Sequence, residues 1–436
     1  MELKSRKLIR ELSLKDKSAV IAGWIHELRD LAKIKFILLR DVSGILQCIV
    51  KDEKLFKKFS ELTIESVIAL KGAPKKADIK SIDVSHKDFE FEIDDIEIIS
   101  KAEVLPITVT EKGVNIGLSK RLDYRSIDLR KRKNLAIFRI QAALIEGMQK
   151  YLNDNNFVQV FTPSLLGTSS ESGSEVFQVI YYDKKAYLRQ DPQLHRQLAV
   201  AGGFEKIYDI GPSWRAEQSH TVKHLTEHRT CAAEIAFISS EQDTMRIEEQ
   251  VIISALKNVK EKCQDELKLI GADIKIPKTP FPELKFPEIY SILKKLGKNI
   301  KVGDDVDAEA DKLLADYVKK KFDCDFFFIN GFPFKLKPFY VYHDSDYARS
   351  VDLYCKSFEL SSGGQREHRY DVLMKNLKEK KLNINNLKWF TDFFRYGVPS
   401  HGGFSIGIER LTQVLLGIEN IREAVLFPRD SERLEP

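Results

Sequence analysis

Charged residues that could hold a nucleotide stand close together in Arg215-Ala-Glu217 and in the polar loop that contains Lys223 and His224. An arginine can grip an α-phosphate and stabilise charge that develops at the phosphorus atom, and a glutamate can accept a hydrogen bond from the adenine amino group. The loop cations could meet the outer phosphates. Taken alone, the segment also fits a solvated hairpin tip, so the nucleotide interpretation depends on the rest of the chain.

A second candidate phosphate site is the segment GGFSIGIERL at 402–411. Glycines let a strand approach a ligand closely, and Arg410 opens the following helix, where anions bind. Upstream, Asp352 and Glu359 could lie on two adjoining strand segments and share a Mg²⁺ that bridges phosphates. The alternative is a glycine-rich turn with a surface arginine, and two unrelated carboxylates.

A zinc site is the alternative use of the histidine-rich loop. His224, Glu227 and His228 have the H-x-x-E-H form of an inverted zinc peptidase motif, and His220 extends the row. That chemistry needs both histidines on one helical face, with the glutamate as base. The flanking residues are too polar to bury a catalytic helix, so we do not expect zinc.

Residues 19–99 have the pattern of an all-β unit. Five short apolar runs, with a helical piece at 52–62 between the third and the fourth, predict a small OB-type barrel. Such barrels bind single-stranded nucleic acid or sugars, or serve as inert adaptors. A connector follows at 103–133, rich in lysine and arginine towards its end, which fits either a solvated hinge or a basic strip beside a polyanion.

From residue 134 onward the pattern is mixed α and β. A helix is predicted because apolar residues recur every three or four positions from Ile137 to Leu152. A strand follows at FVQVFTP, and Pro163 closes it. Further strands are expected at 206–217, 228–238 and 350–364, and a strand that runs into a helix at 402–417. Residues of about 241–330 have the character of an insertion. The helical spacing joins Ile137, Ile140, Leu144, Met148 and Leu152.

Composition narrows the class of protein further. The chain has 436 residues, a formal net charge of +5 and 43% hydrophobic residues, as expected for two or three soluble domains. Five widely spaced cysteines argue against a disulfide framework and for a reducing compartment. Without an apolar leader or an apolar stretch long enough to span a bilayer, we expect a cytoplasmic protein with no membrane association.

Together these segments resemble a known family. FVQVFTP, GPSWRAE with KHLTEH, and GGFSIGIERL are similar, in that order, to the three signature motifs of class II aminoacyl-tRNA synthetases. The amino-terminal barrel and basic connector resemble the subgroup that charges Asp, Asn or Lys. The strings QDPQLHRQL, ELSSGGQREHRYDVL and NIREAVLFPRDSERLEP resemble aspartyl-tRNA synthetases of the archaeal and eukaryotic type.

The resemblance implies an α+β fold with an OB-fold anticodon-binding domain at 1–102, a hinge at 103–133 and a class II catalytic domain at 134–436. In that domain helices flank an antiparallel sheet. It also implies a homodimer, with Pro163 ending the motif at the interface. The implied activity joins L-aspartate to ATP, with Mg²⁺, and transfers the product to tRNA(Asp).

The resemblance also assigns roles to single residues. Arg215 and Arg410 would be catalytic, holding the α- and γ-phosphates of a bent ATP, while Asp352 and Glu359 would bind Mg²⁺. The other ATP contacts would be Glu217, Lys223, His224, His228 and Glu359. The aspartate contacts would be Glu171, Asp191, Gln193, Arg196 and Arg366. The anticodon contacts would be His26, Arg29, Phe36 and Gln47.

Four positions depart from the family pattern. Asp191 replaces a serine, Arg196 a lysine, Ala232 an acid that meets the substrate's ammonium group, and His228 an aromatic residue that stacks on adenine. Because Ala232 removes one negative charge and Asp191 adds one, we hypothesise that Asp191 takes over the ammonium contact. The alternatives are a pocket that accepts another amino acid, as in asparaginyl-tRNA synthetases, and a repurposed or non-catalytic relative.

His26 bears on the choice of tRNA. A histidine at this position is similar to aspartyl enzymes that also accept tRNA(Asn), whereas a tryptophan is typical of strict ones. A polar surface histidine with no such role is the alternative, so charging of tRNA(Asn) as well as tRNA(Asp) stays open.

Overall fold

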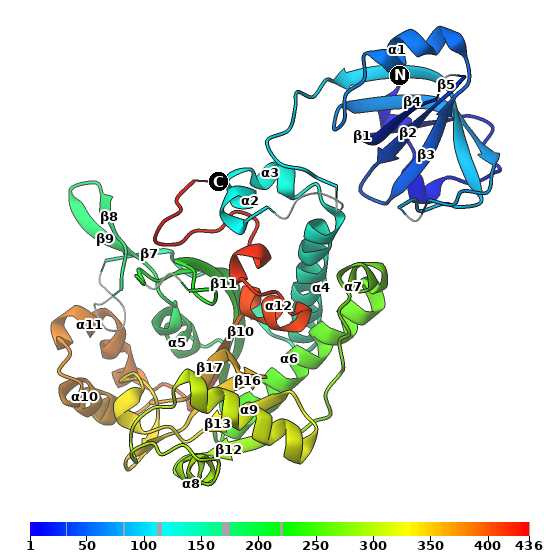
Figure 1. Cartoon of the computed structure of the whole chain (residues 1–436). Coiled ribbons are helices and arrows are strands. Elements are labelled where there is room, and N and C mark those ends of the chain that lie inside the picture. Colours follow the sequence, from blue (N-terminus) through cyan, green and yellow to red (C-terminus); the bar gives the residue numbers. More distant parts are fainter. Residues whose placement is uncertain (32, 82, 111–115, 168–174, 219–220, 436) are drawn as a thin grey trace. The chain divides into compact units, whose positions relative to one another are not determined.

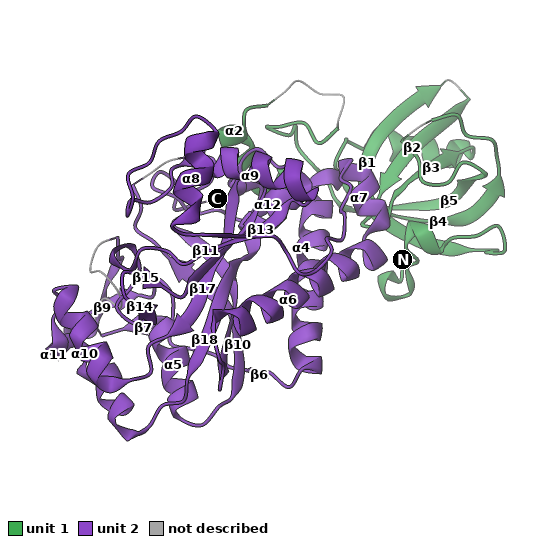
Figure 2. Ribbon diagram, turned by 90° about the horizontal axis from the view of Figure 1, so that it is seen from below, with its two compact units in different colours: residues 1–128 green, residues 129–436 purple. Residues whose placement is uncertain are grey.

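The computed structural model describes residues 1–436 except 32, 82, 111–115, 168–174, 219–220 and 436 (Figure 1). The described chain forms two compact units, Met1–Asp128 and Leu129–Pro436, which Figure 2 shows in different colours. The division falls within the predicted connector at 103–133.

The first unit contains the predicted barrel. Five strands close on themselves in the order β1-β2-β3-β5-β4, and helix α1 (Phe56–Ser60) lies between the third and the fourth in sequence, as the pattern predicted. Along β1, Ala19, Ile21 and Ile25 point into the core, because side chains alternate with a period of two. The strands are β1 (Ala19–Leu31), β2 (Ile34–Arg40), β3 (Ile45–Val50), β4 (Val67–Lys76) and β5 (Phe89–Ser100).

The second unit is built on one large sheet. Eight of the described strands form it in the order β12-β13-β16-β17-β18-β11-β10-β6, and the pairs are antiparallel except β10 with β6 and β12 with β13. This is the predicted α+β architecture with a largely antiparallel sheet. The strands are β6 (Val158–Gln159), β10 (Lys206–Trp214), β11 (Glu227–Ala236), β12 (Glu283–Lys285), β13 (Phe326–Asn330), β16 (Ser350–Cys355), β17 (Phe358–Arg366) and β18 (His401–Gly407).

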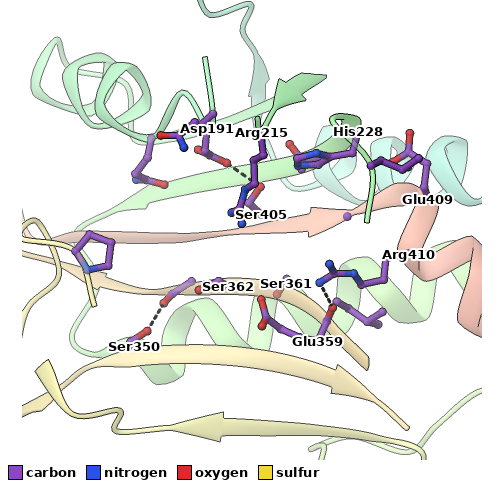
Figure 3. Close-up of a pocket in the computed structure, with 18 of the residues that line it drawn as sticks. Asp191, Arg215, His228, Ser350, Glu359, Ser361, Ser362, Ser405, Glu409 and Arg410 are labelled. Carbon is purple, nitrogen blue, oxygen red and sulfur yellow. Dashed lines mark hydrogen bonds between the residues drawn. The ribbon is translucent and has the colours of Figure 1, made fainter. Parts of the chain in front are cut away.

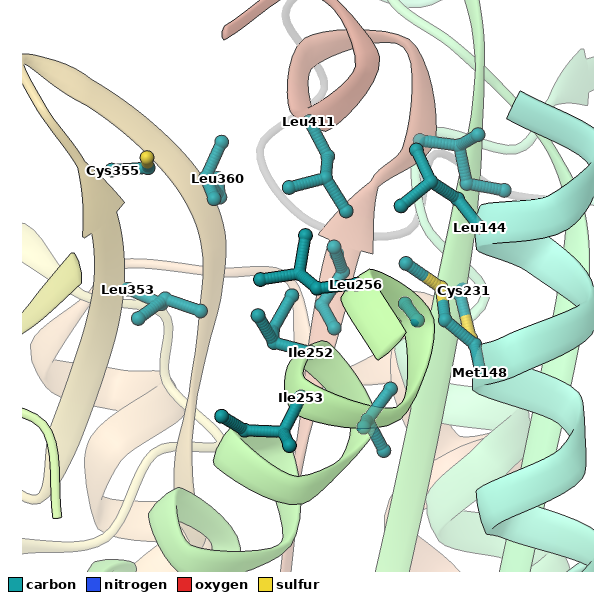
Figure 4. Packing of buried hydrophobic residues seen from close by; sticks show 14 of the residues in the cluster. Leu144, Met148, Cys231, Ile252, Ile253, Leu256, Leu353, Cys355, Leu360 and Leu411 are labelled. Carbon is teal, nitrogen blue, oxygen red and sulfur yellow. The ribbon is translucent and has the colours of Figure 1, made fainter. Parts of the chain in front are cut away.

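Three helices cover one face of this sheet: α4 (Arg132–Asp154), α6 (Glu241–Lys262) and α12 (Ile408–Leu416). The apolar stripe predicted for 137–152 is buried along its whole length in α4. Figure 4 shows Leu144 and Met148 of α4, Ile252 and Leu256 of α6 and Leu411 of α12 in one cluster against the strands. Each such side chain stabilises the fold by about 1.5–3 kcal/mol, so this face is fixed.

The segment predicted as an insertion, about 241–330, is built into this layer instead. α6 begins with a capping box formed by Ser240 and Asp243, and its apolar face packs against α4 and the sheet. β12 and β13 extend the same sheet beyond β16. The high lysine content of 241–268 belongs to the exposed face of α6 and α7 (Gln264–Ile270), so charge alone concealed a core element.

The strand predicted at FVQVFTP is shorter than expected. β6 covers only Val158–Gln159 and pairs with β10 at the edge of the sheet. Beyond it, the amide of Val160 still donates to the carbonyl of Tyr208 (2.9 Å). An edge strand with one neighbour in the described chain gives up its ladder early, and Pro163 has no amide hydrogen to continue it.

The remaining elements surround the sheet. α5 (Gln193–Ala201) packs with α10 (Tyr370–Glu379) and α11 (Ile384–Thr391) around Phe339 and Phe390. α8 (Glu288–Lys295) and α9 (Ala308–Phe322) pack around Leu293 and Leu314. The short pieces are α2 (Leu118–Asp123), α3 (Arg125–Asp128), β7 (Leu165–Leu166), β8 (Gln178–Tyr181), β9 (Lys184–Leu188), β14 (His343–Asp344) and β15 (Tyr347–Ala348).

Candidate active site

A cavity lies on the face of the sheet that α4 and α6 leave uncovered. In β11, Cys231, Ala233 and Ile235 belong to the core with these helices, so the alternate residues point the other way. Two of those alternate residues, His228 and Thr230, line the cavity. Strand alternation thus separates a packed face from a polar one.

One end of the cavity is a hydrogen-bonded cluster around Arg366, at the end of β17. Its Nε donates to Oε1 of Glu234 (3.0 Å), and its Nη2 donates to Oε1 of Gln193 (3.0 Å). Nε2 of Gln193 donates in turn to Oε2 of Glu234 (2.9 Å). Arg366 and Gln193 line the cavity, and both belong to the residues predicted to bind the amino acid.

Asp191 and Arg196 form a second pair at the same end. Nη2 of Arg196 donates to Oδ1 of Asp191 and to Oε1 of Gln193 (3.0 Å from the latter). Oδ2 of Asp191 accepts from the hydroxyl of Ser405 (3.1 Å). Burial alone would raise the pKa of Asp191, but the charge and hydrogen bond of Arg196 hold it below its usual value. Asp191 is therefore a carboxylate anion at the cavity wall.

The structure separates Asp191 from Arg196 in one respect. The Asp191 side chain is 22% exposed and lines the cavity, whereas the Arg196 side chain is 1% exposed and is absent from the described lining. Arg196, predicted as an amino-acid contact, reaches the cavity only through Asp191 and Gln193.

At the other end of the cavity the predicted nucleotide residues meet. Arg215 follows β10, has a 55% exposed side chain and places Nη1 3.7 Å from Oε1 of Glu217. Nε2 of His224 lies 3.6 Å from Oε2 of the same carboxylate. Lys223 sits over the ring of Phe358, with Nζ 4.1 Å from its centroid. These four charged or titratable residues all line the cavity.

Arg410 and His228 complete this end (Figure 3). Arg410 lies in the first turn of α12, as predicted, and its Nη1 donates to the carbonyl of Glu359 (2.8 Å). Burial, together with the nearby charges of Arg215 and Arg410, lowers the pKa of His228 to about 4. His228 is therefore a neutral ring between two cations at pH 7, which suits a flat, uncharged base.

Asp352 and Glu359 lie on the neighbouring strands β16 and β17, as the Mg²⁺ prediction requires. Oδ2 of Asp352 accepts from Nζ of Lys337 (2.7 Å), while its buried Oδ1 has no hydrogen-bond partner among the described residues. Burial and the adjacent Asp352 charge raise the pKa of Glu359. Two close carboxylates with an unpartnered oxygen fit a divalent cation whose other ligands are phosphates and water.

The zinc alternative fails on secondary structure. Glu227 and His228 begin strand β11 and His224 lies in the preceding loop, so no helix presents them on one face. Within the described residues, no group of three histidine, cysteine or acidic side chains could hold a metal. His220 and Glu171 lie outside the described residues.

The predicted anticodon residues share one area of the barrel. Arg29 pairs with Phe36 across β1 and β2, and Gln47 pairs with Leu38 across β2 and β3. Cross-strand partners point to the same face, and Phe36 and Leu38 are two residues apart, so Arg29, Phe36 and Gln47 lie on one side of the sheet. Gln47 Nε2 donates to Oε2 of Glu90 (3.0 Å).

His26 sits beside them in a β-bulge, where the pairing of β1 with β2 shifts between Ile25 and Glu27. Nη1 of Arg40 donates to Nδ1 of His26 (3.0 Å), and the two terminal nitrogens of Arg40 bind the carboxylate of Glu65 (2.8 Å each). Arginine has no acceptor, so Nδ1 must be the acceptor and Nε2 carries the hydrogen. Burial and Arg40 lower the pKa of His26, which keeps the ring neutral.

Comparisons with known proteins agree with this geometry. Residues 117–431 match the family described as tRNA synthetases class II (D, K and N), and residues 19–99 match the OB-fold nucleic acid binding domain. The chain belongs to the class II aminoacyl-tRNA synthetases. It is an enzyme that uses ATP, an amino acid and tRNA.

Individual relatives span nearly the whole synthetase. It is 38% identical over 431 residues to an aspartate–tRNA(Asp) ligase of Pyrococcus abyssi, covering 97% of each chain. It is 37% identical over 436 residues to an aspartate–tRNA(Asp/Asn) ligase of Thermus thermophilus, covering 99% of this chain and 100% of the relative. An asparaginyl-tRNA synthetase of Pyrococcus horikoshii complexed with asparaginyl-adenylate has a TM-score of 0.90 at 30% identity, covering 99% of both chains.

Among the helices that the structure describes, none combines the length and apolar composition that crossing a bilayer requires.

Three residues of the site were not assigned a role from the sequence. Glu234 accepts hydrogen bonds from Arg366 and Gln193. A single acid in the apolar run CAAEIAF indicates a buried carboxylate that needs a buried donor, so the sequence did carry a signal for this residue. Ser405 lay inside the quoted glycine-rich motif without a role. Lys337 binds Asp352 from a loop with no motif, so nothing in the sequence pointed to it.

Proposed function

We propose that this synthetase activates L-aspartate with ATP and transfers the aspartyl group to tRNA(Asp). The observation that carries the proposal is a single cavity with Gln193 and Arg366 at one end and Arg215 and Arg410 at the other. A guanidinium suits a side-chain carboxylate, and two arginines suit a triphosphate. Aspartate–tRNA ligases among the relatives support the choice of amino acid.

In the first step an oxygen of the aspartate α-carboxylate attacks the α-phosphorus of ATP, and pyrophosphate leaves. The attacking group is already an anion, so the site needs no general base. Arg215 would stabilise the charge on the α-phosphate and Arg410 the γ-phosphate end of the departing pyrophosphate, with Lys223 and His224 near the outer phosphates. Glu217 would accept from the adenine amino group.

Two more groups would hold the nucleotide. The neutral ring of His228 would lie against adenine, where an imidazolium would be disfavoured between Arg215 and Arg410. Asp352 and Glu359 would hold Mg²⁺, which when bound neutralises phosphate charge. The unpartnered Oδ1 of Asp352 and the raised pKa of Glu359 support this assignment.

In the second step a hydroxyl of the terminal ribose of the tRNA attacks the aspartyl carbonyl, and AMP leaves. We propose that the barrel binds the anticodon, with Phe36 stacking on a base, Gln47 and Arg29 donating to base edges, and His26 beside them. His26 presents a neutral Nε2–H donor. Such a donor could bond an acceptor on more than one base, so the site would tolerate more than one base at this position. This favours tRNA(Asn) as a second substrate, as in the Thermus thermophilus relative.

Asparagine is the second candidate amino acid, and one observation favours it. Arg196 does not line the described cavity, and Arg366 already donates to Glu234, so one shared guanidinium faces the side chain. A neutral amide needs less positive charge than a carboxylate. The similarity to an asparaginyl-tRNA synthetase structure points the same way.

We further propose a homodimer in the cytoplasm. Val158 and Phe161, which precede Pro163 at the edge strand β6, are 48% and 83% exposed, as an apolar edge covered by a second copy would be. The five cysteines are free, four of them buried, which fits a reducing compartment.

The test is charging of purified tRNA(Asp) and tRNA(Asn) with labelled aspartate and with labelled asparagine. The proposal expects aspartate on tRNA(Asp), and aspartate on tRNA(Asn) if His26 relaxes the choice. Asparagine on tRNA(Asn) without aspartate on either tRNA would establish the second candidate and overturn the first.

A further inference from the structure

An amino acid brings an α-ammonium cation into the pocket, and a desolvated cation needs an anionic partner. Four carboxylates line the cavity in the described part of the chain: Asp191, Glu217, Glu359 and Glu409. Glu217 stands with Arg215 and His224, and Glu359 stands beside Asp352. Asp191 is thus the candidate that lies with the amino-acid residues Gln193 and Arg366.

Glu409 is also accounted for. Its Oε2 accepts from the amide of Arg229 (2.9 Å), and its Oε1 lies 3.5 Å from Nη1 of the same residue, at the start of α12. Glu234 bonds the lining residues Arg366 and Gln193, but it is fully buried and is not itself part of the described lining. The Glu234 and Glu409 side chains are 0% and 3% exposed, against 22% for Asp191, so they present little surface to a ligand in the cavity.

Asp191 is held in place from two sides and keeps acceptor capacity. Oδ1 accepts from Arg196 and Oδ2 from Ser405, and a carboxylate offers about four lone-pair positions. Figure 3 shows Asp191 directed at Ser405 on the wall of the cavity. Because the Asp191 side chain is 22% exposed in the cavity, its remaining lone pairs can accept hydrogen bonds from a ligand there.

The Asp191 carboxylate lies beside Ser405, in space that a longer side chain at position 232 would also reach. Ala232 is the cross-strand partner of Ser405, and it lies on the same face of β11 as the cavity residues His228 and Thr230. A carboxylate at position 232 would stand beside Ser405 and hence beside the Asp191 carboxylate. Two such anions would repel each other, so an acid at 191 and an acid at 232 exclude one another.

We propose that Asp191 binds the α-ammonium group of the amino-acid substrate, with Arg196 as its positioning residue and Ala232 making room for it. The inference rests on the proposed function only in that the substrate is an amino acid. Arg196 suits this role because one Nη2 atom reaches both Asp191 and Gln193 and so joins the two groups that face the substrate. In the family pattern the acid that meets the ammonium group stands at position 232, on the sheet. Here the acid would be Asp191, which lies just before α5.

The experiment compares aspartate with succinate, which is aspartate without its ammonium group. In Asp191→Asn the charge is lost and the shape is kept, so KM for aspartate in ATP–pyrophosphate exchange should rise about tenfold to a hundredfold. The inhibition constant of succinate should stay within twofold of wild type, and so should KM for ATP. Equal weakening of aspartate and succinate would mean that Asp191 only shapes the pocket, and would overturn the proposal.

A charge-relocation variant gives an independent readout. Asp191→Ser/Arg196→Lys/Ala232→Asp moves the anion to the sheet, and it should recover most of the aspartate affinity that Asp191→Ser loses. Ala232→Asp alone should weaken aspartate, because it places a second carboxylate beside the first. A triple variant that stays folded, with an unchanged melting temperature, but is no better than Asp191→Ser contradicts the exchange of roles.

The proposed function can fail separately. If wild type exchanges with asparagine and not with aspartate, aspartate is the wrong substrate, and the same series is run with asparagine and its deaminated analogue succinamate. The Asp191→Asn effect should then appear for asparagine and be absent for succinamate.

Discussion

The proposed amino-acid pocket and the proposed anticodon face of the barrel each contain one buried arginine. Arg196 in the pocket and Arg40 in the barrel have side chains that are 1% and 5% exposed, and each bonds a carboxylate and a second functional residue. In the pocket the carboxylate partner, Asp191, itself lines the cavity. In the barrel the carboxylate partner, Glu65, is buried and a neutral histidine completes the group.

The difference suits the two ligands. A substrate ammonium group carries a full charge, and a fixed anion can bind it and reject neutral analogues. An anticodon base is neutral and is read through single donors and acceptors. In the proposed anticodon site, a histidine with a fixed tautomer would serve better than a charge. The same buried arginine can therefore build a charged contact in one unit and a neutral contact in the other.

The largest expected effect is a loss of barrel stability when the buried arginine of the barrel is removed. Arg40→Ala removes both hydrogen bonds to the buried Glu65 carboxylate and should lower the free energy of unfolding of the barrel by about 3–5 kcal/mol. Hydrogen–deuterium exchange of peptides from β1 and β2 measures this. Lys51→Ala, which removes an exposed pair with Glu92, is the control and should cost at most about 1 kcal/mol.

Exchange of ATP with pyrophosphate in the absence of tRNA should be unchanged in Arg40→Ala, because that reaction does not use the barrel. If the β1 and β2 peptides exchange hydrogen for deuterium equally slowly in Arg40→Ala and in Lys51→Ala, the buried Arg40–Glu65 pair does not stabilise these strands.

The next effect falls on the nucleotide end of the pocket. Arg215→Ala should lower the rate of adenylate formation by about a hundredfold to a thousandfold, since a charged donor to the reacting phosphate is lost. Arg215 is 55% exposed, so the melting temperature should not change. Arg395→Ala, an exposed arginine in the same unit, is the control for pyrophosphate exchange. A normal exchange rate in Arg215→Ala would remove this residue from the catalytic set.

A third prediction concerns the two neutral histidines, and His228 is the stronger case. Its pKa of about 4 lies below the ordinary value of 6.5, so the neutral form stabilises the fold above pH 6.5 and this stabilisation is lost as the pH falls towards 4. Between pH 7.5 and pH 5, wild type should lose about 2 kcal/mol more unfolding free energy than His228→Phe. Parallel pH curves for the two proteins, from urea unfolding, would mean that His228 does not titrate at a lowered pKa.

The smallest effect tests the donor role of His26. His26→Gln keeps an N–H near the position of Nε2, whereas His26→Phe removes it. His26→Phe should weaken binding of an anticodon stem-loop about fivefold, the worth of one neutral hydrogen bond of about 1 kcal/mol, and His26→Gln should bind nearly as well as wild type. If both variants bind equally, the histidine contributes no donor to the RNA.

Local patterns predicted much of the fold. The stripe on α4, the five barrel strands with their intervening helix, and the strand that runs into α12 each follow from spacing that neighbouring residues set. Prediction failed where tertiary context decided. α6 looks like a charged appendage because its exposed face carries the lysines, and β6 is short because only β10 supports it within the described chain.

The same distinction holds in the site. The residues that converge on the cavity come from motif segments, so their gathering followed from the resemblance. Two contacts did not follow from it. Arg196 lies in α5 within the string QDPQLHRQL, but its side chain is behind Asp191 and outside the described lining. Lys337 binds Asp352 from a loop with no motif. The Arg40–Glu65–His26 group needs a bulge at His26 and a left-handed backbone at Glu65 (φ 66°), and neither feature is visible in the sequence.

The most direct test of the central claim is ATP–pyrophosphate exchange by the wild-type enzyme without tRNA, with aspartate, asparagine and a panel of other amino acids. We expect exchange that depends on aspartate and is at least about a hundredfold less efficient with asparagine, because a guanidinium selects a carboxylate over an amide. Exchange that prefers asparagine, or no exchange with any amino acid, would contradict it.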